Sequence, residues 1–504
     1  MTTYFSLFRS SFYLVFLLLA FLASCLPDIQ DVKVDRTHLK IAAPLINSKT
    51  TVDNLFDKVG RSDNIVIYPD NTLGFVYKGN VVEVTGKELF RSFGRLFFKL
   101  VDKKSTINIP IPDQEVKEGH IGGDTLIFLF QGNGKDTIDY TLTIPTMKSP
   151  DGQPLSIKTH FDGEPIRIKR SVKDFSFGFN PGNSFDVLID AKDKDGQDLP
   201  DIGAVWMAYD TLYFTYIEGV FGKDSFLLPK DTVIIDVFDK LEEGGAFFKD
   251  PQVTVTIESS FGFPVSARIK ELSVINKKQL RVPLHSPLID KGIFLEYPSL
   301  AEVGASKSTV FAFDKDNSNI YTAFNSNPTK LIYEFTGIGN PDPSNPTLGF
   351  VTDSSFLRIN VKVELPINGW VDRFALSEKV DWNWDPGNLS SVDSVTIKTI
   401  LNNGLPIDME VQVYLLKDDE VLDSIFVPKR WQVKGAPIDA VGFSTGLTEN
   451  RNSTKVGKSV IDHMQMANKA LYKLKVSTTN APDKTSILRK TDVIDLKLGV
   501  LVQI

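Results

Sequence analysis

The chain has 504 residues, a formal net charge of −7 at pH 7 and 42% hydrophobic residues. This apolar content is ordinary for globular proteins, and the length predicts more than one domain. Mild acidity, without any block of lysines and arginines, argues against nucleic acid as a partner. The histidines form no HxH or HExxH pattern, so no zinc motif is present: His38, His120, His160, His285 and His463.

The chain begins with the features of a signal peptide. Arg9 is the only charged residue in residues 1–24, and an apolar run follows it over residues 12–22. This run is shorter than the roughly 20 apolar residues that a transmembrane helix needs. We therefore predict that residues 1–24 are removed, which leaves 480 residues with a formal charge of −8.

The apolar run ends in Leu22, Ala23, Ser24 and Cys25. These four residues resemble the lipobox of bacterial lipoproteins, an aliphatic residue and two small residues before a cysteine. The resemblance implies that the Cys25 thiol carries a diacylglyceryl group and that the new amine is acylated, with palmitate-type chains. Several chains anchor a protein stably, since each buried methylene contributes about 0.8 kcal/mol. The alternative is a secreted protein with an incidental thiol, but Cys25 is the only cysteine and has no disulfide partner within the chain.

Residues 25–40 are predicted to form a lipidated tether. In the enterobacterial lipoprotein rule an aspartate after the cysteine retains the protein at the inner membrane, so Leu26 favours the outer membrane. Residues 26–31 are mildly acidic and are similar to the tethers that send lipoproteins of Bacteroidota to the cell surface. The expected location is the outer membrane, with both the periplasmic face and the cell surface left open.

The body is expected to be mainly β. Alternating β-branched and aromatic runs are bounded by Gly, Pro, Asn and Asp, which is typical of strands and turns. The clearest runs cover residues 64–68, 73–77, 125–130, 185–189 and 232–237. Helices are expected only over residues 49–59, with Thr51 as N-cap, and over residues 460–471, where a strand reaching residue 476 is the alternative. Many short strands favour tandem β-sandwich-like domains.

One internal repeat is visible at an offset of 142 residues. Residues 253–257 lead through Gly262-Phe263-Pro264 into a second strand, and residues 395–397 lead through Gly404-Leu405-Pro406 into another. Glycine can adopt a positive φ at such a corner, and proline suits a strand start. We interpret the match as a duplication, with chance as the alternative.

This strand, corner and strand pattern resembles the β-sandwich of late-embryogenesis-abundant water-stress domains. The arrangement as a whole is similar to an uncharacterised group of Bacteroidota outer-membrane lipoproteins, through residues 43–48, residues 217–222 and the two Gly-x-Pro corners. The resemblance implies location and fold but no activity. The expected domains are a β domain over residues 41–165 and two β-sandwich repeats over residues 166–300 and 301–504.

Two sets of residues are candidate binding sites. Asp193, Asp195 and Asp198 are closely spaced around a glycine as in calcium loops, although the distal glutamate is missing and an acidic hairpin tip is the alternative. No other cofactor is expected. Trp382 and Trp384, with Trp370 nearby, suit sugar rings if the indoles are exposed. The alternative is a strand with a buried tryptophan.

No nucleophile elbow, Walker loop or dinucleotide fingerprint occurs in the sequence. We therefore expect a non-enzymatic lipoprotein, held on the membrane by its lipid, that binds or scaffolds an envelope protein or a β-barrel complex. The first alternative is a surface module that binds a glycan or a lipid. The second is a hydrolase assembled from scattered residues, for which sequence offers no test.

Overall fold

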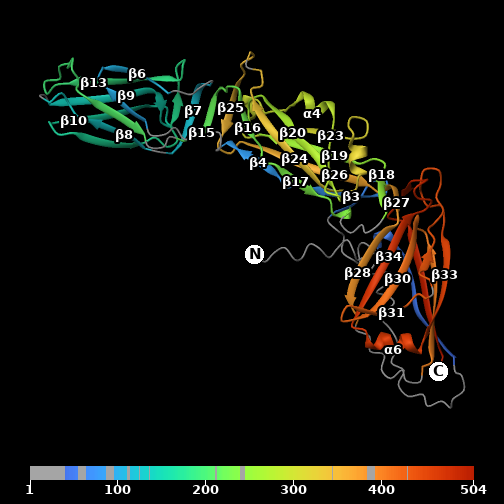
Figure 1. The fold of residues 1–504 in the computed structure, drawn as a ribbon. Helices are drawn as coiled ribbons and strands as arrows, with labels where there is room; N and C mark the ends of the chain where they lie inside the picture. The colour runs from blue at the N-terminus through green and yellow to red at the C-terminus, as the bar shows by residue number, and fades with distance from the viewer. Residues whose placement is uncertain are drawn as a thin grey trace.

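The computed structural model describes residues 40–54, 64–86, 96–109, 114–123, 125–134, 137–209, 213–238, 244–342, 344–382, 392–427 and 429–503. The expected signal peptide, lipobox and most of the tether therefore lie outside the described residues. Figure 1 shows three β lobes arranged end to end, which we call the distal, middle and C-terminal lobes. Among the residues described, no helix has the length and apolar character needed to cross a membrane.

The distal lobe is a sandwich of an eight-stranded and a four-stranded antiparallel sheet. The larger sheet has the order β25-β15-β7-β12-β9-β13-β6, and β10 pairs with β9. Its strands are β6 (Lys104–Asn108), β7 (Glu115–Gly123), β9 (Ile138–Lys148), β10 (Pro154–Phe161), β12 (Ser176–Gly178), β13 (Ser184–Lys192), β15 (Tyr213–Val220) and β25 (Leu348–Thr352). The smaller sheet has the order β11-β8-β14-β5, from β5 (Leu96–Leu100), β8 (Thr125–Phe130), β11 (Ile166–Ser171) and β14 (Val205–Tyr209).

The middle lobe is a second sandwich. One sheet, ordered β2-β3-β26-β19-β23 with β4 on β26, contains β2 (Ile65–Ile67), β3 (Leu73–Lys78), β4 (Val82–Thr85), β19 (Gln252–Ser259), β23 (Lys307–Phe313) and β26 (Phe356–Pro366). The other, ordered β16-β24-β20-β21 with β17 on β24 and β22 on β20, contains β16 (Asp224–Leu227), β17 (Asp231–Ile234), β20 (Val265–Asn276), β21 (Arg281–Pro283), β22 (Ile293–Phe294) and β24 (Pro328–Gly339). Its helices are η1 (Asp236–Phe238), α4 (Pro287–Lys291), η2 (Leu300–Glu302) and α5 (Ile320–Phe324).

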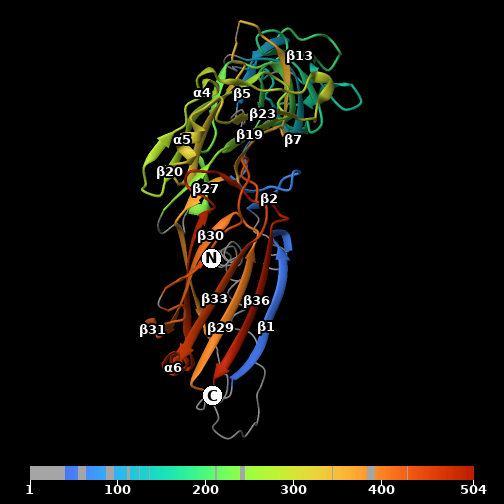
Figure 2. The same ribbon diagram turned by 90° about the vertical axis from the view of Figure 1, so that its right-hand side faces the viewer.

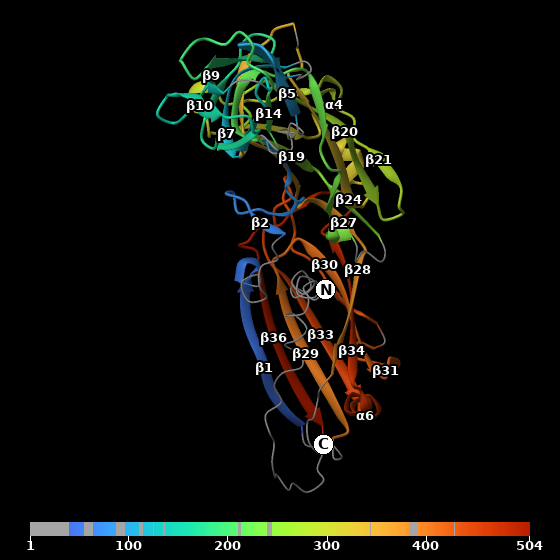
Figure 3. The same ribbon diagram turned by 90° about the vertical axis from the view of Figure 1, so that its left-hand side faces the viewer.

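The C-terminal lobe is a third sandwich, and Figures 2 and 3 show one of its sheets, β1-β36-β29-β33, along its length. That sheet contains β1 (Lys40–Thr51), β29 (Ser394–Asn403), β33 (Thr448–Gly457) and β36 (Val493–Gln503). The second sheet, β28-β34-β30-β31 with β32 on β30, contains β28 (Phe374–Asp381), β30 (Ile407–Lys417), β31 (Glu420–Ser424), β32 (Trp431–Val433) and β34 (Lys469–Thr478), and α6 (Lys458–Met466) precedes β34. A small sheet of β18 (Gly245–Phe248), β27 (Asn368–Asp372) and β35 (Ser486–Ile487) joins this lobe to the middle lobe.

The lobes are nested within one another along the chain. The first described strand, β1, pairs with the last, β36, so the chain starts in the C-terminal lobe, passes through the middle lobe to the distal lobe and returns. The mainly β, sandwich-like fold expected from the sequence is confirmed. The sheets do not follow the contiguous ranges 41–165, 166–300 and 301–504, because β11 pairs with β8 and β23 pairs with β19 across those limits.

The repeated corner occupies the same place in the middle and C-terminal lobes. In both, the strand before the corner, β19 or β29, lies in one sheet, and the strand after it, β20 or β30, lies in the opposing sheet. The neighbouring strands also correspond between the two lobes. In the first sheet, the order β26-β19-β23 of the middle lobe matches β36-β29-β33 of the C-terminal lobe. In the second sheet, β24-β20-β21 matches β34-β30-β31. A helix also follows the corresponding strand in each lobe, since α5 follows β23 and α6 follows β33.

The corner glycines are needed for space and not for a positive φ. Neither Gly262 nor Gly404 has a left-handed backbone, which corrects the conformation expected from the sequence. A Cβ on Gly262 would lie 2.1 Å from the Phe350 ring, and a Cβ on Gly404 would lie 2.7 Å from the Val493 carbonyl oxygen. Close approach of a neighbouring strand or ring therefore selects glycine at both corners.

The two expected helices are correct in part. Residues 49–51 belong to β1, while the Thr51 hydroxyl accepts a hydrogen bond from the Asn54 N–H at 3.2 Å, as an N-cap does. Residues 55–63 lie outside the described residues. Over residues 460–471 the chain forms the end of α6 and the start of β34, so both alternatives were partly right.

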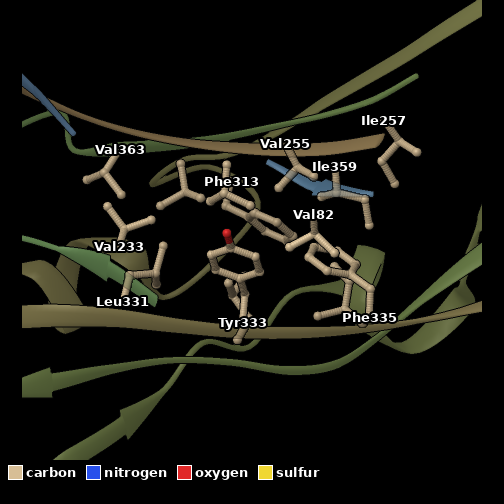
Figure 4. Packing of buried hydrophobic residues seen from close by; sticks show 14 of the residues in the cluster. Val82, Val233, Val255, Ile257, Phe313, Leu331, Tyr333, Phe335, Ile359 and Val363 are labelled. Atoms are coloured by element: carbon tan, nitrogen blue, oxygen red, sulfur yellow. The ribbon is translucent and has the colours of Figure 1, made fainter. Parts of the chain in front are cut away.

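The core of each lobe consists of side chains from every second residue of the strands, which point from both sheets into the space between them. Figure 4 shows the middle core, in which the Tyr333 ring lies among Val233, Leu331 and Phe313. The Tyr333 hydroxyl donates its proton toward Asp231 Oδ2 at 3.0 Å and the Asn80 carbonyl oxygen at 3.2 Å. Burial and the nearby Asp231 carboxylate raise the pKa of Tyr333 above its usual range, so the hydroxyl stays protonated.

We expect Tyr333→Phe to destabilise the protein by about 1–2 kcal/mol, because two acceptors lose their shared donor. The measurement is the midpoint of chemical unfolding of the full chain, compared between variants because three lobes need not unfold in two states. Tyr321→Phe is the control, since Tyr321 is 42% exposed and its hydroxyl has no bond to a described residue. Equal midpoints for the two variants would contradict the role of the Tyr333 hydroxyl.

Gly404→Ala should destabilise the C-terminal lobe by about 1–3 kcal/mol, because the added Cβ meets the Val493 backbone, which cannot move without disturbing β36. Gly446→Ala is the matched control in the same lobe, since its Cβ would enter open space. Thermal unfolding followed by circular dichroism measures the difference. A Gly404→Ala protein as stable as the control would show that the corner tolerates a side chain.

Candidate functional site

The structure places the three candidate tryptophans differently. Trp382 is only 8% exposed, and its indole Nε1 donates a hydrogen bond to the Met464 carbonyl oxygen in α6 at 2.9 Å. This side chain belongs to the core of the C-terminal lobe, as the buried alternative expected. Trp384 lies outside the described residues.

Trp370 belongs to an aromatic cluster at the joint between two lobes. Its ring stacks on the Phe247 ring of the paired strand at a centroid distance of 5.7 Å, and Tyr321 meets Phe247 edge-on at 5.3 Å. The whole of β28 separates Trp370 from Trp382, a length of about 25 Å at the rise of a strand. The structure therefore does not bring these two residues into one site.

The acidic candidate residues form a turn. Asp193 Oδ1 accepts hydrogen bonds from the N–H groups of Asp195 at 2.9 Å and Gln197 at 2.8 Å, and Asp198 pairs with Lys103 at 3.1 Å. Two of the three carboxylates thus already have partners. Over the described ranges, no group of three or more His, Cys, Asp and Glu side chains is arranged to hold a metal ion.

We expect the protein to have the same melting temperature in excess calcium chloride and in EDTA. An ion bound to the folded state would add about 2.7 kcal/mol at a hundred times its Kd, which differential scanning calorimetry resolves easily. Asp193→Ala should lower stability by about 0.5–2 kcal/mol in either solution, because two turn N–H groups lose their acceptor. A calcium-dependent rise that Asp195→Asn abolishes would contradict this expectation.

A different surface combines exposed aromatic and basic side chains. It is the outer side of the four-stranded sheet of the distal lobe, and we call it the distal face. In β8, Leu126, Phe128 and Phe130 point into the core, so Ile127 and Leu129 point outward. The same alternation directs the following side chains outward from the other strands: Phe97, Lys99, Arg167, Lys169, Trp206 and Ala208.

Strand register arranges these side chains in two rows. Lys99, Trp206, Leu129 and Arg167 are consecutive cross-strand neighbours in the first row. The second row contains Phe97, Ala208, Ile127 and Lys169 in the same order. Each row spans about 14 Å across four strands, and the rows lie about 7 Å apart. On the distal face the edge strand β5 thus carries Lys99 and Phe97, the opposite edge strand β11 carries Arg167 and Lys169, and Trp206 lies on a strand between them.

The indole of Trp206 is held in place. Its Nε1 donates to Gln131 Oε1 at 3.1 Å, and the Lys99 ammonium lies 5.8 Å from the ring centroid. Phe97 beside it is 66% exposed, an unusual position for a large aromatic side chain. A positioned indole and an exposed phenyl ring can stack with an apolar ring face of a ligand.

The charge of this sheet is one-sided. Its four strands contain Lys99, Arg167, Lys169 and Arg170 and no acidic residue, in a chain whose formal charge is −7. None of these cations forms an ion pair with a described residue. On the larger sheet of the same lobe, by contrast, Lys117 pairs with Glu218 at 2.7 Å, which lowers the pKa of that carboxyl below its usual range.

Sequence reasoning missed the distal face because its residues come from four segments between residues 96 and 209. Each segment alternates correctly for a strand, but nothing in the sequence says which strands are neighbours. A signal was present, since Phe97 and Lys99 stand at alternate positions and basic residues alternate with isoleucine in 166–169.

No protein-family model matches this chain, and no curated protein matches it. Among solved structures, a protein described as secreted from Parabacteroides distasonis has 13% identity and a TM-score of 0.28, covering 57% of this chain and 88% of that one. A chain from the structure of infectious bursal disease virus, Gx strain, has 7% identity and a TM-score of 0.16, covering 88% of this chain and 81% of that one. An archaeal virus protein with a triple jelly-roll fold has 10% identity and a TM-score of 0.12, covering 84% and 90%. Likenesses at these TM-scores carry no argument about what this chain does.

Proposed function

We propose that this chain is a non-enzymatic binding protein of the cell envelope, anchored in the outer membrane through acylated Cys25, that presents its distal face to a partner. The observation that carries the proposal is the pairing of β1 with β36, which brings both ends of the described chain to one end of the molecule. The distal face lies in the lobe that is farthest from that end (Figure 1).

The direction of β1 supports this orientation. At its end, Val52 N–H donates to the Asp492 carbonyl oxygen, and the chain then enters the middle lobe at β2. Lys40, at the other end of this 12-residue strand, pairs with Gln503. The length of β1 thus places Lys40 about 36 Å from Thr51, the end of the strand that faces the middle lobe. A tether of 14 residues, 26–39, would join the lipid to the outer end of the C-terminal lobe.

The lipid supplies the membrane attachment, and Leu26 favours the outer membrane over the inner one. An envelope protein or β-barrel complex, the partner expected from the sequence, remains a prediction. A bent rod of three lobes (Figure 1), with its anchor at one end and a basic and aromatic surface without acidic partners in its farthest lobe, suits a display or scaffolding role.

The orientation predicts a large difference in energy transfer from two labelled sites to an acceptor dye in the bilayer. Acylation blocks Cys25, so an introduced cysteine is the only free thiol. A dye on Met466→Cys, at the end of α6 near the strand ends of Lys40 and Gln503, should transfer energy strongly. A dye on Asp195→Cys, in the turn after β13 of the distal lobe, should transfer weakly.

Lipoprotein reconstituted in liposomes is the sample, and Cys25→Ala protein, which should not bind the liposomes, is the control. Mass spectrometry of the mature N-terminus checks acylation directly. Equal transfer from the two sites would contradict an orientation in which the distal lobe lies farther from the bilayer than the C-terminal lobe. An unmodified Cys25 would overturn the proposed anchor.

A further inference from the structure

We infer that the distal face binds an anionic polysaccharide, with sugar rings stacked on Trp206 and Phe97 and acidic groups paired with Lys99, Arg167 and Lys169. This inference rests on the proposed function and names the ligand class of its binding surface. It uses none of the tryptophans that the sequence alone selected.

The aromatic pair fits a sugar ring because such a ring has an apolar face of C–H groups. Trp206 is fixed by its bond to Gln131, so stacking on it costs little ordering of the side chain. Phe97 stands in the next row on the neighbouring strand, beside the small Ala208. The small side chain of Ala208 lies between Phe97 and Ile127 in the second row.

The basic side chains fit acidic groups along the same ligand. Lys99 and Arg167 close the two ends of the first row, and Lys169 closes one end of the second. Because no described acid pairs with them, their charges are free to meet a ligand. Some exposed basic residues on another sheet do lie against acids, such as Arg358 beside Glu83 and Lys362 beside Glu364, whereas the strands of the distal face contain no acid.

The open sheet face and its position favour a polymer over a membrane. A sheet face accommodates an extended chain, whereas a small ligand would need a concave pocket. The proposed anchor lies in the bilayer at the opposite end of the rod, so the distal lobe is held away from that lipid surface. The overall negative charge of the chain opposes non-specific binding of polyanions, which leaves recognition to this local patch.

The test measures binding of the full mature chain to polygalacturonate, with methyl-esterified pectin as a polymer of the same sugar that has lost most of its charge. We expect binding to polygalacturonate that weakens as salt rises, and much weaker binding to the ester. Trp206→Ala should weaken binding by roughly tenfold, as expected for a central aromatic contact. The triple variant Lys99→Gln, Arg167→Gln and Lys169→Gln should remove the salt dependence.

Matched controls lie on the middle lobe. Phe294→Ala removes a phenyl group that is 72% exposed, and Lys278→Gln removes an exposed cation, and neither should change binding. Circular dichroism and the melting temperature show that each variant is folded. Trp206→Phe, which keeps an aromatic ring, should restore part of the affinity lost in Trp206→Ala.

Three outcomes would overturn the inference. The first is that the protein binds polygalacturonate and its ester equally well. The second is that the variants of the distal face bind polygalacturonate like the wild type. The third is that the protein binds only vesicles of phosphatidylglycerol, which would assign the face to a lipid. Absence of binding with the energy-transfer result intact would reject the polysaccharide and leave the anchored rod standing. Failure of the energy-transfer result alone would reject the orientation and leave the ligand.

Discussion

The pairing of β1 with β36 is the constraint on which the rest of the architecture depends. It joins residues that lie more than 440 positions apart in the chain, through register from Lys40 opposite Gln503 to Thr51 opposite Val493. This pairing makes β36 an inner strand of the sheet, flanked by β1 and β29. Because the C-terminal lobe holds both ends of this pairing, the other two lobes are inserted between its first and second strands.

Each sandwich reaches its shape through the same physical rule, alternation along strands. In the middle and C-terminal lobes the rule is combined with a corner that carries the chain from one sheet to the other. Buried polar groups at this corner are satisfied, as at Asn403, whose amide donates to the carbonyls of Ile407 and Lys434 while its oxygen accepts from the Leu405 N–H. A well-bonded corner with room only for glycine explains why the sequence pattern recurs in both lobes.

The distal lobe departs from the charge pattern of the other lobes. Some exposed cations elsewhere lie beside carboxylates on neighbouring strands, such as Arg358 beside Glu83, and such exposed pairs contribute little stability. On the distal face the cations have no described acidic partner, Lys99 lies over the Trp206 ring, and Phe97 is largely exposed. Side chains that neither fill a core nor pair with neighbours point to a binding role, because folding alone gives no reason for their arrangement.

The sequence by itself determined the class of the fold, because period-two alternation and turn residues act locally. It also identified the repeated corner and, as an alternative, the burial of Trp382, while the lipobox at Cys25 stays a prediction. Only the tertiary structure decided the nesting of the lobes, the role of Gly262 and Gly404 as points of close approach, and the neighbours of Trp206. These features depend on which strands pair across long stretches of chain, and alternation leaves that choice open because every strand with one apolar face satisfies it equally well.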